Sequence, residues 1–417
     1  MSEDNTTMPS ENSIPNESTE NSILEKYRHR TLINKKYIFE KKIGSGSFGS
    51  VHRGKNVISG ESVAIKYEAT TANITTLLWE SKILNHLSGT PGVVKLRYYG
   101  TESNKNIIVM DLFSHTLCEE VAKLKELYSN TSVEIKNLDT DTVLTTQNSR
   151  HSEQGLSPLH SRSPSLTSPP LPHSLLNESD YNNKNSNDTT DALSSGDAVK
   201  YYSTNDTTQT SKSLSSLSSS TQQSATVDTG NKNEIKPYIK DITNYLISML
   251  EIIWRIHDAG IVHRDIKPEN FMFKIMGEEK KLHIIDFGLS RFYMKGNNHV
   301  ENTNNRSIVG TIRYISLNIH EGDVYSRRDD IVSIMYVIIY LIKGKLPWMG
   351  IVAKKGDNRT KEELVHSVKS KVTTAELCEG IPYLFKKLLD YSYTLEFDEK
   401  PDYSYMIRQC KNLIKIL

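Results

Sequence analysis

The segment between residues 131 and 230 constrains the fold most, because the chain on either side of it must build a core without it. Of its 100 positions, 45 are Ser, Thr or Asn, and it contains neither Phe nor Trp. Such a composition cannot bury enough apolar surface to offset the entropy lost on ordering. We therefore expect a disordered insert at 131–232. The polar residues 1–25 predict a disordered N-terminal tail for the same reason.

The remaining composition excludes several classes of protein. The 51 basic and 50 acidic residues nearly cancel, so no net field favours nucleic acid or an anionic membrane as the main partner. Cys118, Cys378 and Cys410 are too far apart to indicate a disulfide framework or a zinc site. The N-terminus lacks the apolar core of a signal peptide, and the apolar run 331–342 is too short to span a bilayer. We expect an intracellular monomer in the cytoplasm or nucleus, without a membrane anchor, and a buried helix at 331–342.

Apolar periodicity predicts an α+β fold with a small β-rich part followed by a larger helical part. Five short β-type runs occur at 37–44, 50–57, 62–69, 93–101 and 106–112. One helical segment, 74–87, interrupts them, and its apolar face comprises Leu77, Leu78, Ile83, Leu84 and Leu87. After the insert, 240–260 carries a helical stripe formed by Ile242, Leu246, Met249, Leu250 and Ile253. Gly260 is placed to end that helix.

The string IGSGSFGSV (43–51) places three glycines between two of the β-type runs. Glycine lets a backbone approach phosphates without a Cβ clash, but Gly-Ser turns are equally common in ordinary hairpins. A strand follows the glycines, whereas a helix follows them in a dinucleotide-binding fingerprint. Lys66 then ends VAIK on the third strand, and Glu80 lies on the following helix. A Lys66–Glu80 pair could hold the lysine against nucleotide phosphates, and the order of the three elements favours this over ordinary surface charges.

The string IVHRDIKPENF (261–271) supplies the residues for phosphoryl transfer. Asp265 could accept a proton from a hydroxyl nucleophile, Lys267 could neutralise charge on the transferring group, and Asn270 could bind Mg²⁺. Asp286, in IIDFGLS (284–290), is a second candidate metal ligand. Because phosphoryl transfer depends mainly on positioning and charge neutralisation, these groups suffice. Together these strings resemble those of protein kinases, which implies an enzyme that uses ATP and Mg²⁺. We expect His263 and Phe287 to be packing residues.

Further strings resemble one kinase family. They are GTIRYISLNIHEG (310–322), SRRDD (326–330), GKLPWMG (344–350) and LEFDEKPDYSYM (395–406). With HRDIKPENF, they resemble the casein kinase I family of Ser/Thr protein kinases. Most kinases carry Ala-Pro-Glu where this chain has SLN (316–318), which is close to the Ser-Ile-Asn typical of that family. The resemblance covers roughly 35–130 and 234–415. It implies a two-lobed kinase fold, with an N-lobe at 30–112 and a C-lobe at 113–415 that the insert interrupts.

The resemblance also implies roles for individual residues. ATP would lie between the lobes, with Met110 as gatekeeper and 111–113 as hinge, and Asp330 would steady the catalytic loop. Arg313 would help to bind a phosphate on substrates that are already phosphorylated. Lys354 and Lys355 either complete that site or belong to a solvated loop. The implied nucleotide-binding residues are Ile43, Gly44, Ser45, Gly46, Ser47, Phe48, Gly49, Val51, Ala64, Lys66, Met110, Asp111, Leu112 and Asp286.

Two functions from different classes fit these residues: an active Ser/Thr kinase acting on acidic or pre-phosphorylated proteins, and a pseudokinase scaffold. The enzyme is favoured because a scaffold has no need of the catalytic set, which is present in full: Lys66, Glu80, Asp265, Lys267, Asn270 and Asp286. The family resemblance further implies activity without a phosphate on the activation segment. Serines spaced three apart within 211–224 make the insert a candidate substrate of the enzyme itself, although any serine-rich run yields such spacings and we favour the plain linker slightly.

Overall fold

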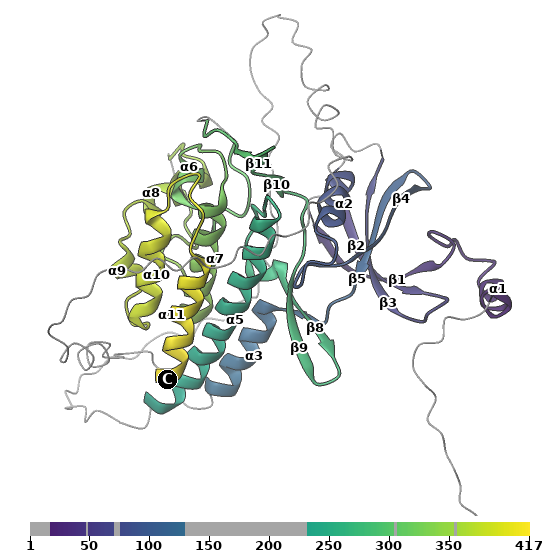
Figure 1. Ribbon diagram of the computed structural model, residues 1–417, viewed down its shortest axis with the longest axis horizontal. Helices are drawn as coiled ribbons and strands as arrows, with labels where there is room; N and C mark the ends of the chain where they lie inside the picture. The colour runs from purple at the N-terminus through teal and green to yellow at the C-terminus, as the bar shows by residue number, and fades with distance from the viewer. Residues whose placement is uncertain (1–16, 47–48, 71–75, 130–231, 304–306, 354–356) are drawn as a thin grey trace, which may run out of the picture. The chain divides into compact units, whose positions relative to one another are not determined.

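The computed structural model describes residues 17–46, 49–70, 76–129, 232–303, 307–353 and 357–417 (Figure 1). The predicted insert therefore lies outside the described residues except for Lys232. Helix α1 (Glu17–Lys26) occupies part of the segment that we expected to be disordered. Its side chains are exposed or half-buried where described. A polar composition argues against a buried core but allows a solvated helix, and this explains the difference.

The N-terminal part is an antiparallel sheet of five strands in the order β1-β2-β3-β5-β4. The strands are β1 (Tyr37–Gly46), β2 (Gly49–Asn56), β3 (Ser62–Ala69), β4 (Leu96–Glu102) and β5 (Lys105–Asp111). All five were predicted from the β-type runs. On β3, Val63 and Ile65 pack into a small cluster on one face, whereas Ala64 belongs to the main core on the other. This alternation directs Lys66 toward the interior of the molecule.

Helix α2 (Thr76–His86) confirms the predicted helix in this part of the chain. Leu77, Ile83, Leu84 and Leu87 are buried as expected. Leu78, which we had assigned to the same apolar face, is 39% exposed. Its position next to Leu77 in the helix turns it about 100° away from the buried stripe.

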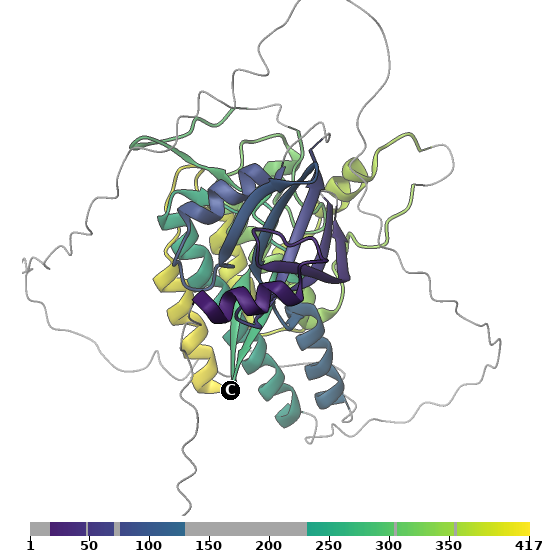
Figure 2. The same cartoon turned by 90° about the vertical axis from the view of Figure 1, so that its right-hand side faces the viewer.

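The C-terminal part is mainly helical and is built around α7 (Arg327–Lys343). Helix α7 contains the predicted apolar run 331–342, and it packs against α5 (Lys232–Asp258) and α10 (Tyr383–Thr394). Helix α3 (Leu117–Ser129) and helix α11 (Tyr403–Ile416) both pack on α5 (Figures 1 and 2). The smaller helices are α6 (Leu317–His320), α8 (Lys361–Lys369) and α9 (Thr374–Leu377). Together the two parts confirm the expected α+β, two-lobed architecture.

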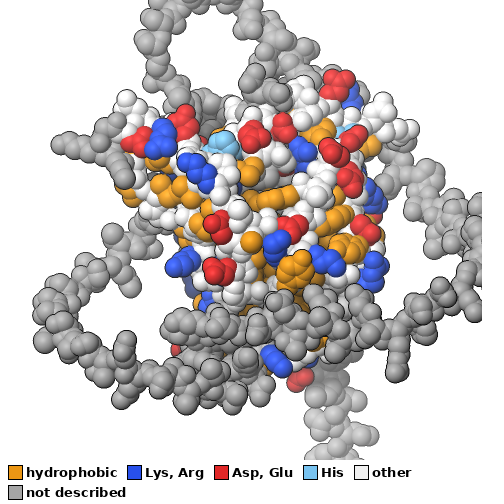
Figure 3. Space-filling model, turned by 90° about the vertical axis from the view of Figure 1, so that its left-hand side faces the viewer, with side chains coloured by type: hydrophobic (Ala, Val, Ile, Leu, Met, Phe, Trp, Pro, Cys, Tyr) orange, Lys and Arg blue, Asp and Glu red, His pale blue; other side chains and the backbone are white. Residues whose placement is uncertain are grey.

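Helix α5 begins earlier than the apolar stripe suggested, and it ends where the sequence predicted. The stripe residues from Ile242 to Ile253 are fully buried, and Gly260 adopts φ 80° just after the helix. None of the helices in the described ranges is long and apolar enough to cross a membrane. On the face seen in Figure 3, acidic and basic side chains are interspersed and form no field of one sign.

Short strands, all but β6 between α5 and α7, lie next to the motifs that we had singled out. Strand β7 (Ile261–Val262) pairs with β10 (Arg291–Phe292), and β11 (Met294–Lys295) pairs with β12 (Asn298–His299). Strands β6 (His115–Thr116), β8 (Phe271–Met276) and β9 (Glu279–Ile284) form a small sheet next to the 3₁₀ turn Pro268–Asn270. Ile284 is hydrogen-bonded to Gly92 and Val94 of the N-terminal part. Asp286 is therefore presented toward the five-stranded sheet.

Candidate active site

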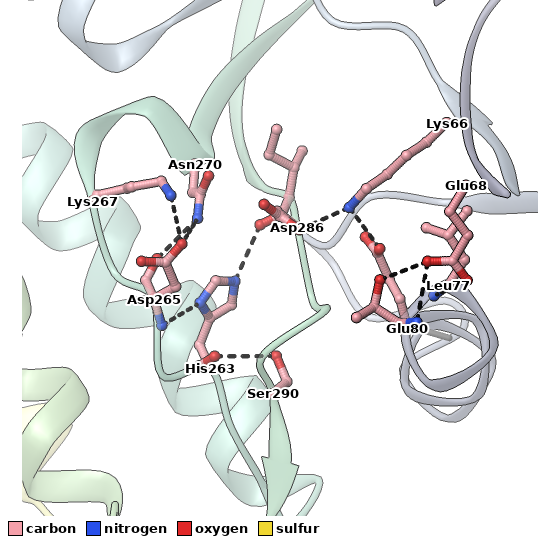
Figure 4. A network of polar contacts seen from close by, with 12 residues as sticks. Lys66, Glu68, Leu77, Glu80, His263, Asp265, Lys267, Asn270, Asp286 and Ser290 are labelled. Carbon is pink, nitrogen blue, oxygen red and sulfur yellow. Dashed lines mark hydrogen bonds and ion pairs between the residues drawn. The ribbon is translucent and has the colours of Figure 1, made fainter. Parts of the chain in front are cut away.

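Lys66 is the central cation of a buried network between the two parts of the protein (Figure 4). Its Nζ lies 2.7 Å from Glu80 Oε2 and 2.9 Å from Asp286 Oδ1. Burial opposes the charged form of Lys66, but the carboxylates of Asp286 and Glu80 raise its pKa above the ordinary value. For Asp286, burial acts to raise the pKa and Lys66 outweighs it, so the pKa falls to about 2. The predicted Lys66–Glu80 pair is thus formed, and it includes Asp286.

Glu68, two residues beyond Lys66 on β3, fixes the helix that carries Glu80. It accepts hydrogen bonds from the Thr76 hydroxyl (2.9 Å) and from the backbone N–H groups of Thr76 (3.1 Å) and Leu77 (3.3 Å). These bonds satisfy donors that an α-helix leaves free at its N-terminus. One strand therefore supplies both the lysine and the carboxylate that orients its partner helix. The sequence analysis did not identify Glu68; the available signal was an acidic residue on the inward face of β3, and nothing in the sequence pointed to Thr76 and Leu77 as its partners.

Asp265 is the centre of a second network, built on the loop after β7. Its carboxylate accepts from Lys267 Nζ (2.5 Å), Thr311 Oγ1 (2.7 Å) and Asn270 Nδ2 (3.2 Å). Burial opposes the charge on Lys267, but Asp265 raises the pKa of the lysine. The structure thus brings Asp265, Lys267 and Asn270 together as predicted, close to Asp286 (Figure 4).

Thr311 is a site residue that the sequence reasoning missed. It lies 46 residues from Asp265, and no spacing rule connects the two. Gly310 brings the segments together: it adopts φ 101°, and a Cβ at this position would lie 2.5 Å from the Arg264 carbonyl oxygen. Only glycine accommodates that approach.

His263 packs against Phe287 with 4.9 Å between ring centroids, as expected of two packing residues. The His263 ring also orders the catalytic loop. Its Nε2 lies 3.1 Å from the Ile285 carbonyl oxygen, which can only accept, so Nε2 carries the proton. Nδ1 then accepts from the Asp265 backbone N–H at 3.3 Å. Burial lowers the pKa of His263 and so favours this neutral form.

Asp330, at the start of α7, fixes the backbone of the same loop. Its carboxylate accepts from the backbone N–H groups of His263 (2.7 Å) and Arg264 (3.0 Å) and from His257 Nε2 (2.9 Å). Arg264 has φ 72°, a left-handed conformation that is strained for a residue other than glycine. Burial opposes the charge on Asp330, but the hydrogen bond and charge of His257 keep its pKa below the ordinary value. This geometry agrees with the loop-steadying role that the resemblance implied.

The predicted nucleotide-binding residues lie on neighbouring strands. Val51 is opposite both Gly44 and Lys66, and Ala64 is opposite Met110. Gly49 has φ 138°, and a Cβ on it would lie 2.1 Å from the Tyr67 carbonyl oxygen. This turn therefore requires glycine for steric reasons. Of the other predicted glycine-loop residues, Ile43, Ser45 and Gly46 lie on β1, whereas Ser47 and Phe48 fall outside the described residues.

The carboxylate of Asp111, at the predicted hinge, is already occupied by ion pairs. Asp111 ends β5, and its carboxylate is paired with Arg97 (2.6 Å) and Lys274 (2.5 Å). Its side chain is thus engaged in ion pairs, so a nucleotide contact at Asp111 or Leu112 would use main-chain groups.

Asn270 and Asp286 fit a magnesium site. Asn270 donates its amide N–H to the Asp265 carbonyl oxygen at 2.9 Å, which leaves the amide oxygen as its ligand atom. Within the described ranges, no cluster of three or more His, Cys, Asp or Glu residues could hold a metal. Two protein oxygens are nevertheless sufficient for Mg²⁺, which usually completes its shell with water and phosphate oxygens.

Of the three residues assigned to a substrate phosphate, the structure describes Arg313. The Arg313 guanidinium lies over the rings of Tyr314 (5.7 Å) and Tyr340 (5.6 Å). Lys354 and Lys355 lie outside the described residues. Arg313 lies two residues beyond Thr311 in the chain, and its role in binding a substrate phosphate stays a prediction.

The sequence matches the protein kinase domain family over residues 37–154 and 197–410. The match covers more than half of the chain and both of its structural parts. The chain belongs to the protein kinase family, whose domain implies a phosphotransferase that acts on proteins.

Proposed function

We propose that this protein is an active Ser/Thr protein kinase of the casein kinase I type, which transfers the γ-phosphoryl group of ATP to Ser or Thr hydroxyls. The observation that carries the proposal is the joint geometry of two networks. Lys66 bridges Glu80 and Asp286, while Asp265 is held by Lys267 and Thr311. A scaffold that only binds partners gains nothing from holding these groups in position.

Each residue then has one task. Asp265 orients the substrate hydroxyl and accepts its proton, and Lys267 neutralises charge on the transferring phosphoryl group. Lys66 positions the nucleotide phosphates, with Glu80 fixing the lysine. Asn270 and Asp286 would hold Mg²⁺, which neutralises charge on the phosphate oxygens.

The casein kinase I type is supported by the segment that replaces Ala-Pro-Glu. Ser316 caps α6 by accepting from the Ile319 N–H, and its hydroxyl donates to Asp329 Oδ1 at 2.5 Å. Asn318 Nδ2 lies 3.3 Å from the same oxygen. The serine and the asparagine of SLN thus share one buried carboxylate on α7.

The acidic or pre-phosphorylated substrate class is part of the proposal. Arg313 would supply the first cation, and Lys354 and Lys355 would supply others. Independence from an upstream kinase is also part of the proposal, and it rests on the casein kinase I resemblance, which implies that no phosphate is required on the activation segment.

The test is Asp265→Asn, compared with Asp258→Asn at the exposed end of α5 as control. Protein made in bacteria is incubated with ATP, Mg²⁺ and peptides carrying Asp or phosphoserine three residues before a serine. We expect the wild type and the control to phosphorylate the peptides, and Asp265→Asn to lose activity by at least 100-fold while still binding ATP. A wild type that binds ATP without transferring phosphate would support the scaffold instead.

A further inference from the structure

Lys369, at the C-terminal end of α8, is a buried lysine without a carboxylate. Its exposed fraction is 2%, and no Asp or Glu of the described ranges forms an ion pair with it. Taking an ammonium group out of water is unfavourable unless other groups replace the solvent. Burial accordingly lowers the pKa of Lys369 well below its ordinary value. A lysine in this position indicates a specific task.

The partners of Lys369 are main-chain carbonyls and aromatic faces. Its Nζ donates to the carbonyl oxygens of Ile312 (3.0 Å) and Ile315 (2.7 Å). The same nitrogen lies 5.2 Å from the centroid of Tyr336 and 5.0 Å from that of Trp348. The lysine is thus surrounded by carbonyl dipoles and π-faces, which favour a cation without neutralising it.

Trp348 completes the attachment of the same segment. Its indole N–H donates to the Arg313 carbonyl oxygen at 2.8 Å. Three of the four carbonyl groups between residues 312 and 315 are therefore held by two side chains from the helical part. These carbonyls have no strand or helix partner of their own, so their geometry depends on Lys369 and Trp348.

The attached segment leads directly to the catalytic carboxylate. Thr311, the residue before it, donates to Asp265 Oδ1 at 2.7 Å. Ser316, the residue after it, donates to Asp329 Oδ1 at 2.5 Å. A shift of 312–315 would displace Thr311 relative to Asp265, and it would move Arg313 at the same time.

We propose that Lys369 is a positioning residue for phosphoryl transfer: it holds 312–315 so that Thr311 meets Asp265 and the protein substrate is presented in register. The inference rests on the proposed kinase function. It places control of the substrate-facing segment on helix α8, through the hydrogen bonds of one buried lysine.

Lys369→Met tests the proposal because methionine keeps an apolar stem of similar length and removes the donor. We expect kcat/KM for a peptide to fall by about 10- to 100-fold, through both kcat and peptide KM, with KM for ATP unchanged within about twofold. Lys343→Met is the matched control. Lys343 Nζ also donates to two carbonyl oxygens, those of Leu377 (3.0 Å) and Glu379 (3.1 Å). Lys343 is the last residue of α7, at the opposite end of that helix from Asp330. The control should retain peptide kinetics close to wild type.

A double-mutant cycle separates positioning from general destabilisation. If Lys369 acts through Thr311, the double variant Lys369→Met/Thr311→Val should lose less kcat than the two single variants predict. Its fold loss should be smaller than the product of the two single fold losses. Fully multiplicative effects would overturn the inference, as would peptide kinetics in Lys369→Met no different from those of Lys343→Met.

If Lys369→Met does not fold, Trp348→Phe, which removes the bond to the Arg313 carbonyl, should show the same effect in weaker form. Wild-type peptide kinetics in that variant would refute the idea.

Hydrogen exchange distinguishes failure of this inference from failure of the proposed function. In Lys369→Met, amides of 312–316 should exchange at least tenfold faster than in the wild type and in Lys343→Met. Unchanged exchange would refute the attachment of the segment even in an active enzyme. A wild type without transferase activity would refute the kinase function, because the exchange measurement requires no turnover.

Discussion

Replacement of Asp330 should separate the stability of the catalytic loop from its chemistry. Asp330 is fully buried, and its carboxylate is hydrogen-bonded to His257, His263 and Arg264 and not to Lys66 or Asp286. Asp330→Asn keeps the size of the side chain but replaces one acceptor oxygen by an N–H₂ group. One of its three donors, from His257, His263 or Arg264, would then face another donor.

The expected magnitude follows from those hydrogen bonds. A bond to a charged acceptor contributes about 1.5–3 kcal/mol, and a buried donor left unpaired costs about as much. Asp330→Asn should therefore lower the free energy of unfolding by about 2 kcal/mol, or roughly 5 °C in Tm. Asp330→Ala leaves three donors unpaired and should lower it by about 5 kcal/mol, close to the whole stability of many domains.

Activity should fall further than stability, because Arg264 needs support to stay at φ 72°. We expect kcat of Asp330→Asn to fall at least tenfold at a temperature where the variant is fully folded, with KM for ATP within about threefold of wild type. Thermal unfolding and steady-state kinetics on the same preparation measure both effects. An Asp330→Ala variant with wild-type Tm and kcat would refute the reasoning.

Two further predictions concern a charge and a proton. Glu80→Gln removes the charge of one of the two carboxylates beside Lys66, so KM for ATP should rise and kcat should fall by about tenfold. The control is Glu25→Gln, at an exposed glutamate. Equal kinetics in the two variants would contradict the role assigned to Glu80. Burial, with the charges of Lys369 and His366, lowers the pKa of His320 to about 3. Below its unfolded pKa of about 6.5, the unfolded chain takes up a proton that the folded protein resists, so stability is lost as the pH falls. His320→Leu should reduce the loss between pH 7.5 and 5.5 by about 1 kcal/mol in urea titrations, and an identical loss in both proteins would contradict this.

The sequence predicted the features that depend on neighbouring residues. Strands β1 to β5 followed from period-two alternation, and the buried face of α5 followed from residues such as Ile242 and Leu246. Lys66 and Asp265 could be identified because phosphoryl transfer requires those residue types at those spacings. Their partners within a few residues, such as Asn270, came with them.

Features that depend on distant contacts could not be predicted. Thr311 looks like any loop threonine until Gly310 places it on Asp265. Lys369 belongs to an amphipathic helix, KEELVHSVK, in which it reads as a solvated charge. Only tertiary packing shows that it is buried among carbonyls. Leu78 was misassigned because two consecutive apolar residues of a helix point about 100° apart, so that only one of them lies in the middle of the buried face.

Helices α3 and α5 lie side by side, and the Tyr128 hydroxyl donates to Asp241 Oδ2 at 3.2 Å (Figures 1 and 2). The helix that ends before residue 130 and the helix that begins after residue 231 are therefore joined by packing as well as by the chain. Cleavage between them would leave one fragment with Lys66 and another with Asp265. Neither fragment alone would have a complete active site, yet the interface between them is already built. In this respect the protein resembles two complementary fragments that are encoded as a single polypeptide.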